Sequence, residues 1–229
     1  MFRNNLIYYE LIIKGKKYYG YVDTGGGMTF LFRNKELLKD VKETDKYIDD
    51  YDYSNHFKNV ILFIGQNFFK NKIVQINYLE KIFRELKSAP KKGYKSFPML
   101  KSKKSDFIHV DIIFENDESR FLFDTGATLT RNGKEYAISF LNGNLFDILG
   151  EKYKIIDNYD DDGSPIIIIP KIIIFNKVIK NIKFLRRLED SFEWMSGITK
   201  INHIGAIGGN VLKNFDIICN YKTNEYLIK

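Results

Sequence analysis

The sequence predicts an all-β protein with few short helices, built from two similar lobes. Two observations carry this prediction. Ile, Phe and Tyr, which favour half-buried strands, are abundant, with 19 Phe and 15 Tyr among 229 residues. The chain also repeats two blocks of sequence, in the same order, once in each half. With 44% hydrophobic and 28% charged residues, the composition is typical of a folded chain with a sizeable core.

The first repeated block is a pair of apolar segments that ends in an acidic loop. YELIIKGKKYYGYVDTGGG (9–27) aligns without a gap with VDIIFENDESRFLFDTGAT (110–128), at an offset of 101. Each copy has an apolar run, a polar turn and an aromatic-rich run before Asp-Thr-Gly. This pattern predicts two β-hairpins that lead into Asp23 and Asp124.

The second repeated block starts with Ile-Gly. IGQNFFKNKIVQINY (64–78) aligns with IGGNVLKNFDIICNY (207–221), now at an offset of 143. Asn67 and Asn210 are expected to cap short helical turns, and strands are expected after them. Residues 78–87 carry apolar side chains at helical spacing, so we expect a strand to about Phe83 and a helix after it.

The repeats divide the chain into an N-terminal lobe (1–88), a basic linker (89–105) and a C-terminal lobe (106–229). Pro90, Gly93 and Pro98 are expected to break regular structure in the linker. The net charge of +7 leaves a nucleic-acid-binding protein as an alternative. Since no base-reading motif accompanies the lysines, we expect a solvated linker and no nucleic-acid partner.

Several classes of protein are disfavoured by the residues present. The single cysteine, Cys219, cannot form an intramolecular disulfide and is expected in the core of a strand. His56, His109 and His203 show no spacing typical of zinc ligands or of a nucleophile's base. Trp194 is expected to pack in the core or on the surface, with the lining of a substrate cleft as the alternative.

No apolar run reaches the roughly 18 residues that a membrane span needs, and the N-terminus lacks a secretion signature. We therefore expect a soluble, cytoplasmic chain; a secreted or periplasmic one is the alternative, if a signal has been removed.

Two aspartates on matching loops suit hydrolysis without a metal or a covalent intermediate. Carboxyl groups brought together share one proton, so one can act as base and the other as acid on a water and a peptide carbonyl. Gly25 and Gly126 would allow a tight turn and a close approach of the two loops. Thr24 and Thr125 could hydrogen-bond across the pseudo-twofold axis.

These paired motifs resemble those of the aspartic proteases of the pepsin and retropepsin clan. In that family Asp-Thr-Gly follows an apolar strand, and apolar-Ile-Gly-x-Asn with a short helix comes later. The resemblance covers both ends of each lobe and implies a bilobal acid-protease fold, two retropepsin-like lobes with the active site between them. It implies a peptide or protein substrate, no cofactor, no metal and a monomer with an internal pseudo-dimer, with a homodimer as the alternative. By the same resemblance the catalytic residues are Asp23 and Asp124, supported by Thr24, Gly25, Thr125 and Gly126, with Ile64-Gly65 and Ile207-Gly208 packed beneath the loops.

Family members close over the substrate with a β-hairpin flap, and the second lobe has a candidate. EKYKIID (151–157) and PIIIIPKIII (165–174) are strand-like and flank the turn NYDDDGS. A calcium loop is disfavoured because Ile169 stands where a glutamate is required; a solvated acidic hairpin without a catalytic role is the other interpretation. Only 41 positions separate Asp23 from Ile64, and the polar segment 34–57 is expected to form a helix and a loop, so the first lobe should lack a full flap. The expected flap and substrate-binding residues are Tyr159, Asp162, Gly163 and Ser164.

The first loop differs from the second, because Asp-Thr-Gly-Gly-Gly stands where the second copy has Asp-Thr-Gly-Ala-Thr. Gly26 offers neither a methyl nor a hydroxyl group and is expected to loosen the backbone. The alternative function is therefore a catalytically inactive peptide-binding or scaffold protein of the same fold.

Overall fold

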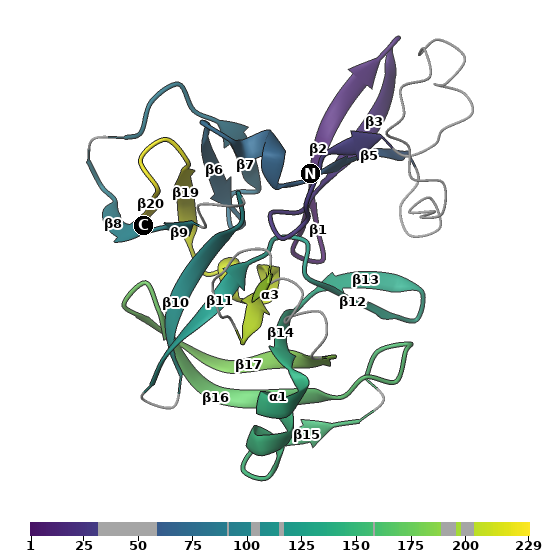
Figure 1. The fold of residues 1–229 in the computed structure, drawn as a ribbon. Helices are drawn as coiled ribbons and strands as arrows, with labels where there is room; N and C mark the ends of the chain where they lie inside the picture. Colours follow the sequence, from purple (N-terminus) through teal and green to yellow (C-terminus); the bar gives the residue numbers. More distant parts are fainter. Residues whose placement is uncertain are drawn as a thin grey trace.

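The computed structural model describes residues 1–31, 59–90, 92–101, 106–114, 117–157, 159–188, 196–197 and 204–229. These residues form β-strands and a few short helices, which confirms the predicted fold class (Figure 1). The strands before the middle of the chain are β1 (Phe2–Arg3), β2 (Leu6–Ile13), β3 (Lys16–Val22), β4 (Phe30–Leu31), β5 (Val60–Ile64), β6 (Ile73–Asn77), β7 (Ile82–Glu85), β8 (Lys95–Pro98) and β9 (Leu100–Lys101).

The later strands are β10 (Ile108–Phe114), β11 (Asp117–Phe123), β12 (Thr128–Arg131), β13 (Lys134–Ala137), β14 (Ser139–Asn142), β15 (Ile155–Ile156), β16 (Ile166–Ile174), β17 (Lys177–Arg187), β18 (Gly205–Ile207), β19 (Asp216–Asn220) and β20 (Glu225–Ile228). The helical elements are the 3-10 helix η3 (Gln66–Phe69), α1 (Gly143–Gly150) and α3 (Gly209–Leu212). Helix α1 has Asn142 as its N-cap, whose side chain accepts a hydrogen bond from Leu145 N. Asparagine is a preferred N-cap residue, so the sequence carries a signal for this helix start.

Each acidic loop is supported by the same arrangement of strands. The hairpin β2–β3 leads into Asp23 and the hairpin β10–β11 into Asp124, as predicted. A parallel strand lies beside the second arm of each hairpin, β5 against β3 and β18 against β11. Because these strands end at Ile64 and Ile207, their carbonyl groups accept hydrogen bonds from Asp23 N and Asp124 N, each at 3.0 Å. The Ile-Gly segments therefore lie directly under the two loops.

A five-stranded sheet with the order β7-β6-β19-β20-β8 joins the two halves of the chain. Its central pair is antiparallel and joins one strand from each half, with Ile76 opposite Ile217. Both side chains are buried in the main hydrophobic core. The two halves therefore share one sheet, which Figure 1 shows at the upper left, and one core.

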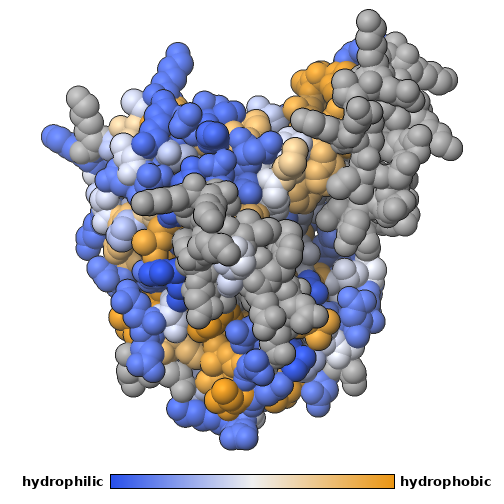
Figure 2. All heavy atoms as spheres, in the orientation of Figure 1, coloured by the Kyte–Doolittle hydropathy of each residue, from blue (hydrophilic) through white to orange (hydrophobic). Residues whose placement is uncertain are grey.

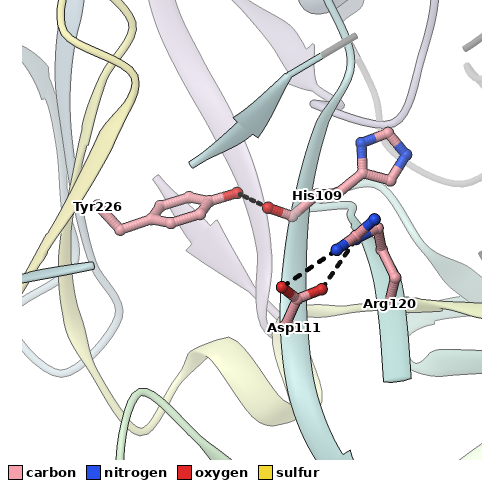
Figure 3. A network of polar contacts seen from close by, with 4 residues as sticks. All are labelled: His109, Asp111, Arg120 and Tyr226. Atoms are coloured by element: carbon pink, nitrogen blue, oxygen red, sulfur yellow. Dashed lines mark hydrogen bonds and ion pairs between the residues drawn. The ribbon is translucent and has the colours of Figure 1, made fainter. Parts of the chain in front are cut away.

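Polar contacts attach this shared sheet to the β10–β11 hairpin (Figure 3). The buried Tyr226 of β20 donates a hydrogen bond to the carbonyl oxygen of His109 on β10, at 3.0 Å, and its ring stacks on Phe123. On the same hairpin Arg120 pairs with Asp111 at 2.9 Å. The strand that leads into Asp124 is thus packed against the C-terminal strand of the shared sheet.

The predicted helix after Phe83 is wrong. Residues 78–81 form a turn, in which Glu80 N donates to the side chain of Asn77 and Lys81 has a φ of 56°. Strand β7 follows and pairs with β6. Pairing with β6 satisfies the backbone hydrogen bonds of this segment, and this outweighs the helical spacing of its apolar residues.

The expectation of irregular structure in the linker is also wrong in part. Strand β8 pairs with β20 at the edge of the shared sheet, and β9 pairs with β10. The free edges of β20 and β10 provide backbone partners for this segment. Pro98 is tolerated because it lies at the end of an edge strand.

Figure 2 shows hydrophilic atoms over most of the upper left, where the shared sheet lies, and more apolar atoms near the bottom, around α1 and β15.

None of the helices within the described ranges is long and apolar enough to cross a membrane. The expectations for segment 34–57, His56, Asn158, Trp194 and His203 lie outside the described residues.

Candidate active site

The two aspartates lie at corresponding positions, immediately after β3 and β11. Each carboxylate accepts a hydrogen bond from the glycine two residues later, Gly25 N to Asp23 Oδ1 at 2.8 Å and Gly126 N to Asp124 Oδ1 at 2.9 Å. Each carboxyl group also lies against the glycine of the opposite loop, Asp124 against Gly25 and Asp23 against Gly126. The structure therefore brings together the two aspartates singled out by the repeat.

Glycine at positions 25 and 126 is required by this close approach. A Cβ atom at Gly25 would overlap the carboxyl group of Asp124, and one at Gly126 would overlap the carboxyl group of Asp23. Neither glycine adopts a left-handed backbone conformation. The need is therefore for space between the loops, not for an unusual turn.

Thr24 and Thr125 hydrogen-bond across the two loops, as predicted. Thr24 N donates to Thr125 Oγ1 at 3.1 Å, and Thr125 N donates to Thr24 Oγ1 at 3.0 Å. Each hydroxyl then donates to the opposite strand, Thr24 to Phe123 O at 2.8 Å and Thr125 to Val22 O at 3.0 Å. Both side chains are buried. This symmetric network leaves the loops little freedom to move apart.

A further cross-loop bond comes from Tyr21, which the sequence analysis did not single out. Its hydroxyl donates to the carbonyl oxygen of Gly126 at 2.8 Å. The corresponding residue in the second copy is Leu122, which has no hydrogen to donate. Two residues before the aspartate, the first copy has a tyrosine and the second a leucine. This difference between the copies could have drawn attention to Tyr21.

The electrostatic environment favours a shared proton. Burial raises the pKa of both Asp23 and Asp124, and the negative charge of Asp124 raises the pKa of Asp23 further. Hydrogen bonds from Asp23, Gly126 and neighbouring amides oppose the shift at Asp124. The pair therefore holds one shared proton at a pH at which ordinary carboxyl groups are ionised.

The unusual Gly26 is explained by Phe63 rather than by a loose backbone. A Cβ atom at Gly26 would overlap the ring of Phe63, which is buried and stacks on Phe30 at 4.8 Å. In the second loop the corresponding residues are both small, Ala127 and Ala206. The first loop therefore combines a large strand residue with a glycine, and its packing does not support the expectation of a loosened backbone.

The predicted caps at Asn67 and Asn210 are wrong. Gly65 and Gly208 are the N-caps, and neither makes a side-chain cap bond. The asparagine side chains reach back instead, because Asn67 Oδ1 accepts from Thr29 N at 2.8 Å and Asn210 Oδ1 accepts from the Ser139 hydroxyl at 2.7 Å. They thereby attach the short helices to the segments that follow the acidic loops.

The predicted flap forms a hairpin, since Ile155 and Ile156 of β15 pair with the start of β16. The loop between them turns at Gly163, whose φ is 77° and whose N–H donates to Asp160 O at 3.1 Å. Asp162 and Ser164 flank this turn. Tyr159 packs against the apolar residues that include Ala127 and Leu129.

A second hairpin, β12–β13, directly follows the Asp124 loop and was missed by the sequence analysis. Its turn is Asn132-Gly133, with both φ angles positive at 51° and 63°. Asn-Gly between two short strands is the signal that would have identified it. The carboxylate of Asp161, from the flap loop, accepts from Asn132 N at 2.8 Å and Gly133 N at 2.9 Å. The flap loop is therefore attached to this hairpin.

Within the described ranges there is no cluster of three or more His, Cys, Asp or Glu side chains placed to hold an ion. Cys219 is buried in β19, where burial raises the pKa of its thiol.

Comparisons with known proteins add a distant likeness. No family model and no curated protein sequence matches the chain. Among solved structures, a retropepsin-like aspartic protease from Rickettsia conorii is similar, with 18% identity and a TM-score of 0.39, covering 61% of this chain and 96% of that one. A likeness this distant does not assign a function.

Proposed function

We propose that this protein is an aspartic endopeptidase in which Asp23 and Asp124 activate one water molecule between two lobes, residues 1–88 and 106–229. The observation that carries the proposal is that each of the two carboxyl groups packs against the glycine of the opposite loop, on loops cross-bonded through Thr24 and Thr125. Two matching carboxyl groups that share one proton provide an acid and a base at the same point.

In the proposed reaction the two aspartates have different roles. Asp124, ionised, takes a proton from the water as its oxygen attacks the peptide carbonyl carbon, while Asp23 donates its proton to the carbonyl oxygen. A tetrahedral gem-diol forms. Asp124 then passes its proton to the amide nitrogen, Asp23 takes the proton back from one diol hydroxyl, and the C–N bond breaks to give an acid and an amine.

The surrounding residues hold this geometry rather than reacting. Four residues, Thr24, Gly25, Thr125 and Gly126, set the distance between the loops. Small errors in that distance reduce the rate of a reaction that needs both carboxyl groups at once.

We propose that the loop after β15 covers the substrate, with Tyr159, Asp162, Gly163 and Ser164 as its contact residues. The shared five-stranded sheet supplies within one chain an arrangement that otherwise needs two, so we propose that the protein works as a monomer.

The test uses the full chain and a denatured protein mixture, with cleavage products identified by mass spectrometry. Asp23→Asn and Asp124→Asn should each reduce turnover by about 10²–10⁴-fold, the usual contribution of a general acid or base. A statine-type mimic of the tetrahedral intermediate should inhibit the wild-type chain. The matched control is Asp117→Asn, which removes an exposed carboxylate from the first residue of β11. Full activity in either dyad variant would contradict the assignment, and peptide binding without turnover at any pH would identify a non-catalytic binding module.

A further inference from the structure

A pocket of about 400 Å³ lies between the β12–β13 hairpin, the flap loop and β17. We call it the basic pocket and define it by Leu129, Arg131, Tyr136, Ile138, Tyr159 and Lys183. Leu129 and Ile138 form its apolar part and are buried. The remaining four side chains carry polar or charged ends.

The basic pocket is attached to the loop that carries Asp124. Ile138 N donates to the carbonyl oxygen of Ala127 at 2.9 Å, and Ala127 is three residues after Asp124. Ala127, Leu129 and Ile138 also belong to one apolar cluster, against which Tyr159 packs. A peptide whose scissile bond lies at Asp124 therefore has this pocket within reach of a neighbouring side chain.

Two cations flank the tyrosine at the rim of the pocket. The guanidinium of Arg131 lies 4.3 Å from the centre of the Tyr159 ring, and Lys183 Nζ lies 4.7 Å from it while donating to the Tyr159 hydroxyl at 3.0 Å. The hydrogen bond from Lys183 is the main reason why the pKa of Tyr159 is lowered. The site therefore has a positive potential.

Among the described residues, the acidic groups near these cations, Arg131 and Lys183, form no ion pair with them. Asp161 lies near Arg131, but its carboxylate accepts hydrogen bonds from Asn132 N and Gly133 N. Asp160, which is buried, accepts from Ser164 N at 2.6 Å. Among the residues that the structure describes, no carboxylate lines the pocket itself.

We propose that the basic pocket receives an acidic side chain, Asp or Glu, of the peptide substrate. This rests on the proposed function, because the peptide must lie across Asp23 and Asp124 for its neighbouring residue to reach the pocket. The methylene groups of the substrate residue would contact Leu129 and Ile138, and its carboxylate would accept hydrogen bonds from Lys183 and Arg131. Lys183 is half-buried and Arg131 exposed, so Lys183 contributes more.

The experiment compares cleavage of a peptide library by the full-length chain and its variants. Cleavage sites should be enriched in Asp or Glu at one fixed position relative to the scissile bond. A Glu peptide should be cleaved about tenfold faster, as kcat/KM, than the same peptide with Gln there, the effect of one charge-assisted hydrogen bond. Lys183→Gln should remove most of this preference, whereas Lys183→Arg keeps the charge and should keep it. The matched control is Lys180→Gln, which removes an exposed lysine three residues away on the same strand.

The outcomes separate the two proposals. Absence of any cleavage would contradict the proposed function. Cleavage without an acidic preference, or a preference unchanged in an Arg131→Gln/Lys183→Gln double variant, would overturn this inference alone.

Binding to the Asp124→Asn chain gives a second measurement that needs no catalysis. By fluorescence anisotropy the Glu peptide should bind about tenfold more tightly than the Gln peptide, and the difference should shrink as salt is added. Equal affinity of the two peptides would also overturn the inference.

Discussion

The ring of Phe63 fills the space into which a Cβ atom at Gly26 would project. Phe63 lies on β5, beside β3, the strand that leads into Asp23, and it is buried against Phe30 and Tyr21. In the other half the matching positions are occupied by Ala206 and Ala127. The first acidic loop therefore has a large side chain facing a glycine, whereas the second has an alanine at both of the matching positions.

Gly26→Ala should destabilise the folded chain and lower turnover, because the new methyl group forces Phe63 or the Asp23 carboxyl group to move. Overpacking of this kind typically costs about 1–3 kcal/mol in the free energy of unfolding, to be measured by urea denaturation. Gly27→Ala is the control, since a Cβ atom there meets nothing within 4 Å. The double variant Gly26→Ala/Phe63→Leu should recover part of the loss. Equal stability of Gly26→Ala and wild type would show that the loop is not confined.

Thr24→Ala should weaken both the fold and the activity. The substitution leaves the buried Thr125 N and Phe123 O without the partners they have in the folded chain. A buried group left unsatisfied costs about 1–3 kcal/mol. Thr24→Ser keeps the hydroxyl and should retain most of the stability in a thermal or urea unfolding experiment. If the serine and alanine variants behave alike, the hydroxyl contributes nothing to the contact between the loops.

The dyad should make stability depend on pH in a defined direction. Burial raises the pKa of Asp23 and Asp124, so the folded chain binds protons more tightly than the unfolded chain does. The contribution of the pair to stability is therefore full below about pH 4, the ordinary carboxyl pKa, and decreases as the pH rises through the raised pKa of the pair.

Asp23→Asn should therefore gain stability relative to wild type at neutral pH and gain none in strong acid. The difference in melting temperature between variant and wild type, followed against pH, measures this effect. Asp117→Asn should show no such rise, and a flat difference for Asp23→Asn would indicate that the pKa of Asp23 is not raised in the folded chain. In the wild type, activity should fall at low pH as Asp124 gains a proton and at high pH as Asp23 loses one.

Asp161→Ala should release the flap loop from the β12–β13 hairpin. The N–H groups of Gly133 and Asn132 hold the pKa of Asp161 below its usual value, so the carboxylate is ionised and accepts both hydrogen bonds near neutral pH. In the variant these two amides should exchange with deuterium faster. Asp162→Ala is the control from the same loop. Exchange at positions 132 and 133 that is unchanged in Asp161→Ala would show that the loop and the hairpin are not joined through this side chain.

The sequence was sufficient to predict those features that a local pattern or an internal repeat encodes. An apolar run, a polar turn and an aromatic-rich run before each Asp-Thr-Gly predicted the two hairpins, and the offset of 101 identified Asp124 as the partner of Asp23. Prediction failed for residues 78–87, because the spacing of Leu79, Ile82 and Phe83 suits a helix as well as a strand. A neighbouring strand, β6, decided between them, and no local pattern encodes that pairing.

The sequence by itself determined that the chain is all-β, that it is internally repeated and that two aspartates occupy matching loops. Only the tertiary structure decided that these carboxyl groups meet, that Phe63 requires glycine at position 26, and that Arg131, Tyr159 and Lys183 gather at one pocket. The physical reason is the separation along the chain over which each kind of interaction acts. Strand propensity and turn chemistry act between residues near each other in the chain, whereas the contacts at both sites join segments that lie far apart in it.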